Sequence, residues 1–179
     1  NSDLVNNTVK DPYIFEFISL NNNYKEQELE NNMVSKIKDV LLELGKGFSF
    51  VGNQYKISVN NQDFYIDLLF YHLELRCYIV VELKAGEFKP EYVGQIGFYV
   101  TAVDKLLKKE YDNPTIGLLL CREKNRVTVD WSLQSANVPI GVSTYKLNNQ
   151  LPKHILDKLP TEEEINLHIY MESGEKNEQ

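Results

Sequence analysis

The sequence predicts a mixed α/β fold, with a central sheet built in the order helix, three strands, helix, strand, and an extra C-terminal strand and helix. Three observations favour it. The 179-residue chain suits one domain with a sizeable core, and 42% hydrophobic and 25% charged residues are ordinary for a globular protein. Apolar runs rich in Val, Ile, Leu, Phe and Tyr alternate with stretches of helical period. No apolar run approaches the roughly 20 residues of a membrane helix.

The N-terminal part is expected to lead into the first helix of the core. Residues 1–10 are polar and are predicted to be a flexible lead-in, and residues 11–20 are predicted to form a short helix that begins at Asp11. Between residues 24 and 44, apolar side chains recur at three- and four-residue steps, which predicts a longer helix that Gly45 ends.

Three strands are expected next. Residues 48–59 read as a strand with a bulge at Gly52, and Asn60-Asn61 suits a tight hairpin turn. Residues 62–86, QDFYIDLLFYHLELRCYIVVELKAG, read as two apolar strands joined by a short turn at HLELR.

The remaining elements complete the core and extend it. The pattern predicts a helix from Pro90 to about Leu107, a buried strand in TIGLLLC, a short helix at 129–136 and a last strand in IGVSTYKL. A further helix is predicted near Thr161, because Thr161 and Glu164 form a capping box.

Three ionisable residues interrupt the apolar hairpin, namely Asp67, Glu82 and Lys84. A buried charge costs several kcal/mol unless it is paired or bound to a metal. If the hairpin is symmetric about its turn, Asp67 and Glu82 lie opposite each other, with Cβ atoms roughly 4.5–5.5 Å apart. Lys84 shares the face of Glu82, because side chains alternate with period two. Either the three form a salt bridge at the sheet edge, or a divalent cation lies between the two carboxylates.

These residues resemble the signature of the PD-(D/E)xK nuclease superfamily, with Asp67 and the Glu82-Leu83-Lys84 run as its motif, although Ile66 stands where the superfamily name has Pro. Residues 11–160 are similar to the nuclease domain of bacterial YhcG-like proteins. The resemblance implies a restriction-endonuclease-like core, with a nuclease domain at 21–171 and a disordered tail at 172–179.

The resemblance also implies further site residues. Glu30 matches a helix position from which the superfamily often offers a glutamate to the metal; favourable placement near a helix start is the alternative role, and Glu28 is the alternative residue. Gln95 and Tyr99, four residues apart on one helix face, resemble a Gln-x-x-x-Tyr element that faces the metal and DNA.

The function implied is a Mg²⁺- or Mn²⁺-dependent endonuclease that hydrolyses phosphodiester bonds of DNA. Asp67, Glu82 and the Leu83 carbonyl would hold the metal, Glu30 would join directly or through water, and Lys84 would assist the attacking water. The alternative is a non-catalytic module of the same fold that binds nucleic acid or a protein. The net charge of −7 disfavours a simple nucleic-acid binder, but a nuclease site concentrates carboxylates.

The sequence also predicts the state of the cysteines and the cellular compartment. Cys77 and Cys121 lie in apolar runs and are expected to be buried, reduced thiols, which fits a bacterial cytoplasm. The polar N-terminus is not a signal peptide, and no membrane partner is expected. The resemblance implies an N-terminal helical domain in a longer chain. The sequence leaves open whether the protein forms a homodimer.

Overall fold

A mixed sheet of six strands forms the centre of the described part of the protein, in the order β1-β6-β5-β4-β3-β2. The computed structural model describes residues 2–150, together with 157 and 163. Strands β2, β3 and β4 pair antiparallel, whereas β4, β5, β6 and β1 pair parallel. The strands are β1 (Tyr13–Phe15), β2 (Phe48–Val59), β3 (Gln62–His72), β4 (Cys77–Leu83), β5 (Ile116–Cys121) and β6 (Ile140–Leu147).

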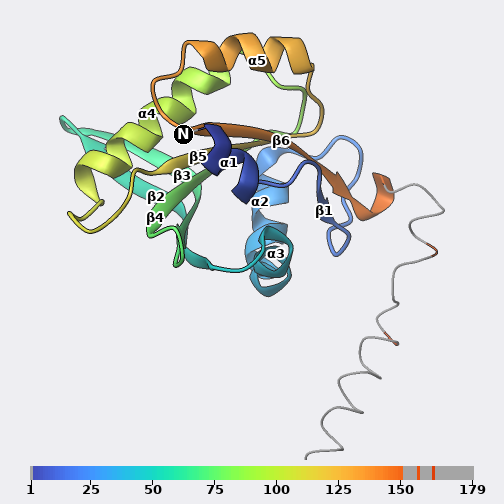
Figure 1. The fold of residues 1–179 in the computed structure, drawn as a ribbon. Coiled ribbons are helices and arrows are strands. Elements are labelled where there is room, and N and C mark those ends of the chain that lie inside the picture. The colour runs from blue at the N-terminus through green and yellow to red at the C-terminus, as the bar shows by residue number, and fades with distance from the viewer. Residues whose placement is uncertain (1, 151–156, 158–162, 164–179) are drawn as a thin grey trace, which may run out of the picture. The chain divides into compact units, whose positions relative to one another are not determined.

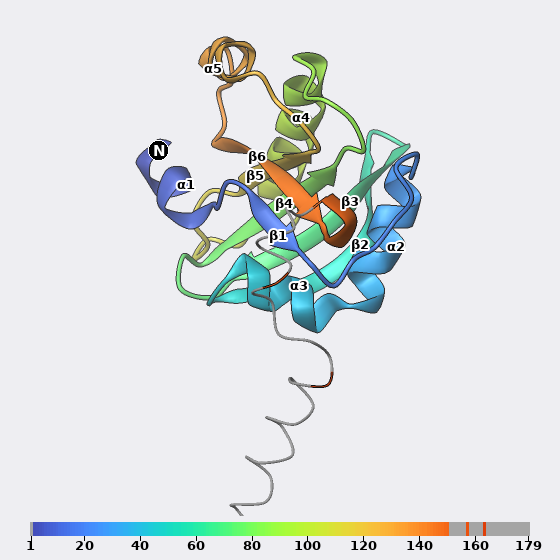
Figure 2. The same cartoon turned by 90° about the vertical axis from the view of Figure 1, so that its right-hand side faces the viewer.

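Helices cover both faces of this sheet, so the predicted α/β class is confirmed (Figure 1). One hydrophobic cluster packs α2 and α3 on one face, and a second cluster packs α4 and α5 on the other. Figure 2 shows the same two layers from the side. No helix among the described residues is both long and apolar enough to cross a membrane. The helices are α1 (Ser2–Thr8), α2 (Glu26–Ser35), α3 (Ile37–Leu44), α4 (Glu91–Leu106), α5 (Arg126–Gln134) and the short 3₁₀ turn η1 (Asn148–Gln150).

The β3–β4 hairpin has the symmetric register that the sequence predicts. Paired residues run from Leu68 opposite Val81 to His72 opposite Cys77, which places Asp67 and Glu82 one step further along the two strands. Both cysteines are buried free thiols, as expected. Because parallel strands end at the same sheet edge, the C-terminal ends of β4 and β5 meet beside this pair.

The β2–β3 hairpin is irregular in two places that matter for the site. Its register shifts by one residue between Phe50 and Gly52, at the predicted bulge. The turn residues Asn60 and Asn61 have φ of 49° and 63°, the left-handed conformation that a tight hairpin turn requires. A third residue of β2, Gln54, also has a positive φ, 41°, although it is neither glycine nor in a turn.

Two predictions for the N-terminal part are wrong. Residues 2–8 form α1 rather than a flexible lead-in, and residues 11–20 contain strand β1 rather than a helix. Tyr13 and Phe15 are fully buried on alternate positions, because β1 pairs with β6 at the edge of the sheet. That partner lies far along the chain, so the local pattern, which also fits a helix, could not reveal it.

The predicted helix at 24–44 is divided into α2 and α3. The break falls at Lys36, whose φ of −117° and ψ of 38° leave the helical region. The helix predicted at 129–136 is present as α5, displaced toward the N-terminus, because the Asn125 side chain caps it by accepting from the backbone N–H groups of Val127 and Thr128.

The chain divides into two compact units, residues 1–149 and residues 150–179. The second unit lies almost wholly outside the described residues. The predicted helix near Thr161 and the predicted tail at 172–179 therefore stay predictions.

Candidate active site

Asp67 and Glu82 are locked together across the β3–β4 hairpin. The backbone N–H of Asp67 donates to Glu82 Oε1 at 3.2 Å, and the N–H of Leu83 donates to Asp67 Oδ2 at 2.9 Å. Each carboxylate is thus held by a backbone donor of the opposite strand. This reciprocal arrangement requires rigid sheet registry, and it brings two acidic groups to one point.

The electrostatics of the pair are unfavourable for two free charges. Glu82 is only 4% exposed, and burial, followed by the nearby Asp67 charge, raises its pKa to about 9. A side-chain hydrogen bond also joins the two carboxyl groups. At neutral pH the two carboxyl groups therefore share a proton, which removes the repulsion between two full negative charges.

Lys84 lies beside the pair but is not neutralised by it. Among the described residues no ion pair within 4.0 Å joins Lys84 to either carboxylate, so the predicted alternative of a salt-bridged trio does not apply. Its Nζ donates to Gln95 Oε1 at 3.3 Å and lies 4.4 Å from the centre of the Tyr92 ring. The ammonium group is thus held on α4 by an amide and an aromatic face, and its charge lowers the Glu82 pKa slightly against the larger effect of burial.

Gln95 and Tyr99 lie together on α4, as the four-residue spacing predicts. A hydrogen bond joins their side chains, and Gln95 also accepts from Lys84. Burial and the Glu82 charge raise the pKa of the Tyr99 phenol, and the hydrogen bond with Gln95 opposes the shift, so the phenol stays neutral. Gln95 is exposed and Tyr99 is buried, so this hydrogen-bonded pair extends from the solvent-exposed side of α4 toward the carboxylates.

Glu30 reaches the pair from α2 on the other side of the sheet. It is only 3% exposed, and its oxygens accept from Asn53 Nδ2 at 3.3 Å and Gln54 Nε2 at 2.6 Å. Burial raises its pKa, the two amide hydrogen bonds oppose that shift, and the Asp67 charge adds to it. Glu28 is instead exposed and accepts from the backbone N–H of Lys25 at the start of α2, so it is a helix cap away from the site.

Sequence reasoning missed the residues that support this site from distant elements. Gln54 Nε2 also donates to Asp67 Oδ1 at 3.1 Å. The Tyr145 hydroxyl on β6 donates to the Lys84 carbonyl at 2.8 Å, which leaves Tyr24 to donate in the buried 2.7 Å contact between the two phenols. Gln54 could have been suspected from the predicted bulge, but nothing local marks the tyrosine pair.

The donor set fits a hard divalent cation. Among the described residues no three His, Cys, Asp or Glu side chains are gathered closely enough to hold a metal by themselves. Asp67 and Glu82 are nevertheless two converging oxygen donors whose mutual repulsion a cation would remove, and Glu30 lies one amide away. Oxygen donors of this kind suit Mg²⁺ or Mn²⁺, with water and backbone carbonyls completing the coordination.

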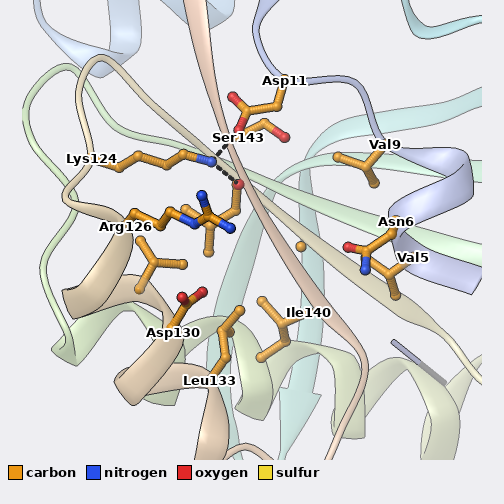
Figure 3. Close-up of a pocket in the computed structure, with 13 residues that line it drawn as sticks. Val5, Asn6, Val9, Asp11, Lys124, Arg126, Asp130, Leu133, Ile140 and Ser143 are labelled. Atoms are coloured by element: carbon orange, nitrogen blue, oxygen red, sulfur yellow. Dashed lines mark hydrogen bonds and ion pairs between the residues drawn. The ribbon is translucent and has the colours of Figure 1, made fainter. Parts of the chain in front are cut away.

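A separate cavity of about 480 Å³ lies between α1, α5 and β6 (Figure 3). Val5 of α1, Val9 just after it, and branched side chains of α5 and β6 line it, together with Arg126 and Asp130. None of the six predicted site residues lines this cavity. The size of this cavity therefore does not mark the candidate site, which is defined by the cross-strand carboxylates.

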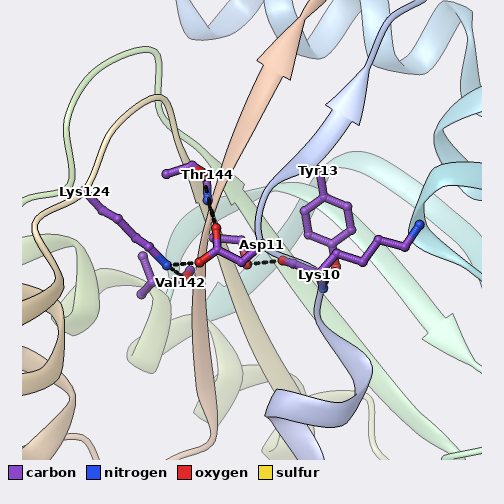
Figure 4. A network of polar contacts seen from close by, with 7 residues as sticks. Lys10, Asp11, Tyr13, Lys124, Val142 and Thr144 are labelled. Carbon is purple, nitrogen blue, oxygen red and sulfur yellow. Dashed lines mark hydrogen bonds and ion pairs between the residues drawn. The ribbon is translucent and has the colours of Figure 1, made fainter. Parts of the chain in front are cut away.

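The polar groups at the rim of this cavity satisfy one another (Figure 4). The Lys124 ammonium forms an ion pair with Asp11 and donates to the Val142 carbonyl at 3.0 Å, and Asp11 accepts from the Thr144 N–H at 3.1 Å. Partial burial favours a higher pKa for Asp11, but the hydrogen bonds from Lys124 and Thr144 outweigh it and lower the pKa. This network stabilises the β6 edge.

An aspartate on one strand of a hairpin and Glu-x-Lys on the next, at the edge of a mixed sheet between helices, define the class as a PD-(D/E)xK nuclease. A family model described as the YhcG PDDEXK nuclease domain matches residues 6–160, and the chain belongs to this family. It is 34% identical over 151 residues to the protein named "Putative nuclease YhcG" of Escherichia coli (strain K12). That match covers 84% of this chain and 40% of the relative, so the chain spans less than half of the relative's length.

Solved structures of repair nucleases are more distant. A repair endonuclease from Pyrococcus abyssi aligns with a TM-score of 0.46 and 16% identity, over 72% of this chain and 49% of that chain. A structure titled as an EndoMS–dsDNA complex aligns with a TM-score of 0.48 and 16% identity, over 76% of this chain and 49% of that chain.

Proposed function

We propose that this chain is a Mg²⁺- or Mn²⁺-dependent endonuclease that hydrolyses phosphodiester bonds of DNA. The observation that carries the proposal is the reciprocal lock of Asp67 and Glu82, in which each carboxylate accepts from a backbone N–H of the opposite strand. Such a lock is costly for a purely structural element, because it holds the half-buried Asp67 carboxylate beside the buried Glu82 carboxylate. Membership of a nuclease family supports the same conclusion.

Asp67 and Glu82 would hold the cation, together with the Leu83 carbonyl. A bound divalent cation supplies a more acidic water and neutralises charge on the scissile phosphate. The backbone donors fix the orientation of both carboxylates before any ligand arrives, and α4 excludes water from the Glu82 side. Glu30 would contribute from α2, either directly or through a water, since Gln54 already links it to Asp67.

Lys84 would orient the attacking water and offset the negative charge that develops on the phosphate. It is suited to this role because its ammonium group is partly exposed, lies close to Glu82 and is not consumed by an ion pair among the described residues. Gln95 holds Lys84 from α4 and Tyr99 holds Gln95, so these two would keep the lysine and the water network in place.

DNA cleavage by an Asp67 variant tests the proposal. Wild-type protein is incubated with linear, nicked and branched DNA plus Mn²⁺ or Mg²⁺, and with a chelator. Asp67→Asn keeps the shape but removes a charge, and cleavage should fall by about 10²-fold or more. Asp63→Asn is the matched control on β3, since the polar contacts of the Asp63 side chain within the described part of the chain are with the exposed residues Ser58 and Lys56. Equal cleavage by wild type and Asp67→Asn, or by samples with and without chelator, would contradict the proposal.

A further inference from the structure

Gln54 is the contact between the acidic residue of α2 and the acidic residue of β3. One atom, Nε2, donates to Glu30 Oε2 at 2.6 Å and to Asp67 Oδ1 at 3.1 Å. A primary amide has two N–H groups, so this bridge uses both of them. Because both partners are carboxylate acceptors, the nitrogen rather than the oxygen of the amide must face them.

The backbone of Gln54 is set in an unusual conformation to make this bridge. Its φ of 41° belongs to the left-handed region, which glycine and asparagine adopt more easily than glutamine. The one-residue register shift between Phe50 and Gly52 puts Gln54 opposite Asp67; the neighbouring pairs are Asn53 with Leu68 and Tyr55 with Ile66. A strained residue that holds two carboxylates is a feature of functional sites.

The bridge lies beside a break in the side-chain alternation of β3. Ile66 and Leu69 of β3 are three residues apart, yet both pack in the cluster on the α4 face. Strict alternation would place them on opposite faces, so the side-chain alternation slips next to Asp67. This irregularity lets Gln54, which is paired with Asp67 at this point, contact Glu30 of α2, the helix that covers the other face.

We propose that Gln54 is a positioning residue of the site, whose amide ties Asp67 to Glu30 and so fixes the Asp67 carboxylate for a divalent cation. Asp67 Oδ2 is fixed by the Leu83 N–H, and Gln54 fixes the other oxygen. Each carboxylate oxygen has two lone pairs, so the amide hydrogen bond leaves room for a cation. Without the amide, the Glu30 and Asp67 oxygens would face each other with no donor between them and would repel. The inference rests on the proposed function.

Mn²⁺ affinity, measured by calorimetry on the metal-free protein, tests the inference with two variants. Gln54→Ala and Gln54→Gly both remove the amide, and both should weaken Mn²⁺ binding by about tenfold, the usual effect of losing a group that orients a metal ligand. Gln54→Gly should also melt at a higher temperature than Gln54→Ala, because glycine relieves the strain of the positive φ. A purely structural role predicts that affinity follows stability; the inference predicts equal affinity losses at different stabilities.

The matched control is Asn60, a turn residue of the same hairpin with a φ of 49°. Asn60→Ala and Asn60→Gly should differ in melting temperature in the same direction, with Mn²⁺ affinity within about twofold of wild type. Unchanged Mn²⁺ affinity in Gln54→Ala, or restored affinity in Gln54→Gly, would overturn the inference alone. A wild-type protein that binds no Mn²⁺ would overturn the proposed function as well.

Discussion

Of the described groups that place a lysine beside an aspartate or a glutamate, the ones at Lys124 and at Lys84 are built in opposite ways. Lys124 and Asp11 form an ion pair at the β6 edge, and the hydrogen bonds that Asp11 accepts from Lys124 and Thr144 lower the pKa of Asp11 despite its partial burial. At the β3–β4 edge, burial and the Asp67 charge raise the pKa of Glu82 to about 9, and Lys84 is held by Gln95 and Tyr92 instead.

The difference separates a stabilising network from a prepared site. An ion pair whose hydrogen bonds are complete has no capacity left for a ligand. A buried glutamate and a half-buried aspartate that share a proton, beside an ammonium group that has no ion pair among the described residues, are unfavourable until a cation and a phosphate arrive. The candidate site is therefore recognised by its two adjacent carboxylates and a nearby ammonium group that forms no ion pair among the described residues, whereas Lys124 and Asp11 at the β6-edge cavity pair with each other.

Replacing each lysine by methionine should separate the two groups most strongly. Lys84→Met should lower DNA cleavage by about 10²-fold or more, because one positioned electrostatic group is lost, while Mn²⁺ binding persists through Asp67 and Glu82. Lys124→Met should leave cleavage within about threefold of wild type. Initial cleavage rates on one DNA substrate, with calorimetric Mn²⁺ affinity, make the comparison. A folded Lys84→Met protein that cleaves DNA at the wild-type rate would contradict the role assigned to Lys84.

The pH dependence of stability should carry the signature of the carboxylate pair. The pKa of Glu82 is raised on folding, from an ordinary 4.5 to about 9. Between these values the native protein keeps a proton that the unfolded chain releases, so in the metal-free protein this stabilising contribution is complete below about pH 4.5 and is lost as pH rises toward 9. The slope is at most about 1.4 kcal/mol per pH unit.

Glu82→Gln should flatten this decline, because the amide does not titrate. Denaturant unfolding at pH 6 and pH 8.5 in the presence of a chelator measures the difference. Parallel declines in wild type and Glu82→Gln would show that another group carries the pH dependence. Glu30 is the first to examine, since burial also raises its pKa.

Replacing a residue of the stabilising network at the β6 edge should change the stability of the protein rather than its rate of DNA cleavage. Lys124→Met leaves Asp11 without its ammonium partner, and should lower the free energy of unfolding by about 1–2 kcal/mol, a modest value because both side chains are partly exposed. For a domain of this size the melting temperature should fall by roughly 2–8 °C. The exposed pair of Lys56 and Asp63 is the control, and Lys56→Met should change the melting temperature less.

The central hairpin could be predicted because everything that defines it is local. Apolar runs flank a polar turn, and the period-two alternation together with a symmetric turn places Asp67 opposite Glu82. That Gln95 and Tyr99 share a face of α4 is also local, since residues four apart on a helix are neighbours, whereas their role in the site was implied by the family resemblance. These residues need no knowledge of distant partners.

The rest of the site depends on contacts that join distant segments. Gln54 reaches Asp67 only because a bulge shifts the β2 register and the backbone adopts a positive φ. Tyr145 reaches the Lys84 carbonyl because β6 lies in the same sheet, and β1 is a strand only because β6 pairs with it. Local patterns do not encode such pairings, so the helix predicted at residues 11–20 was wrong for the same physical reason.

Mn²⁺ binding to Asp67→Asn and Asp11→Asn, measured by calorimetry against wild type, tests most directly whether the β3–β4 carboxylate pair is the cation site. Both variants remove one negative charge near a lysine, so they match in net charge. The account predicts that Asp67→Asn loses Mn²⁺ binding by at least about tenfold and that Asp11→Asn retains it. Mn²⁺ binding that survives in Asp67→Asn at wild-type affinity, or that disappears in folded Asp11→Asn, would contradict it.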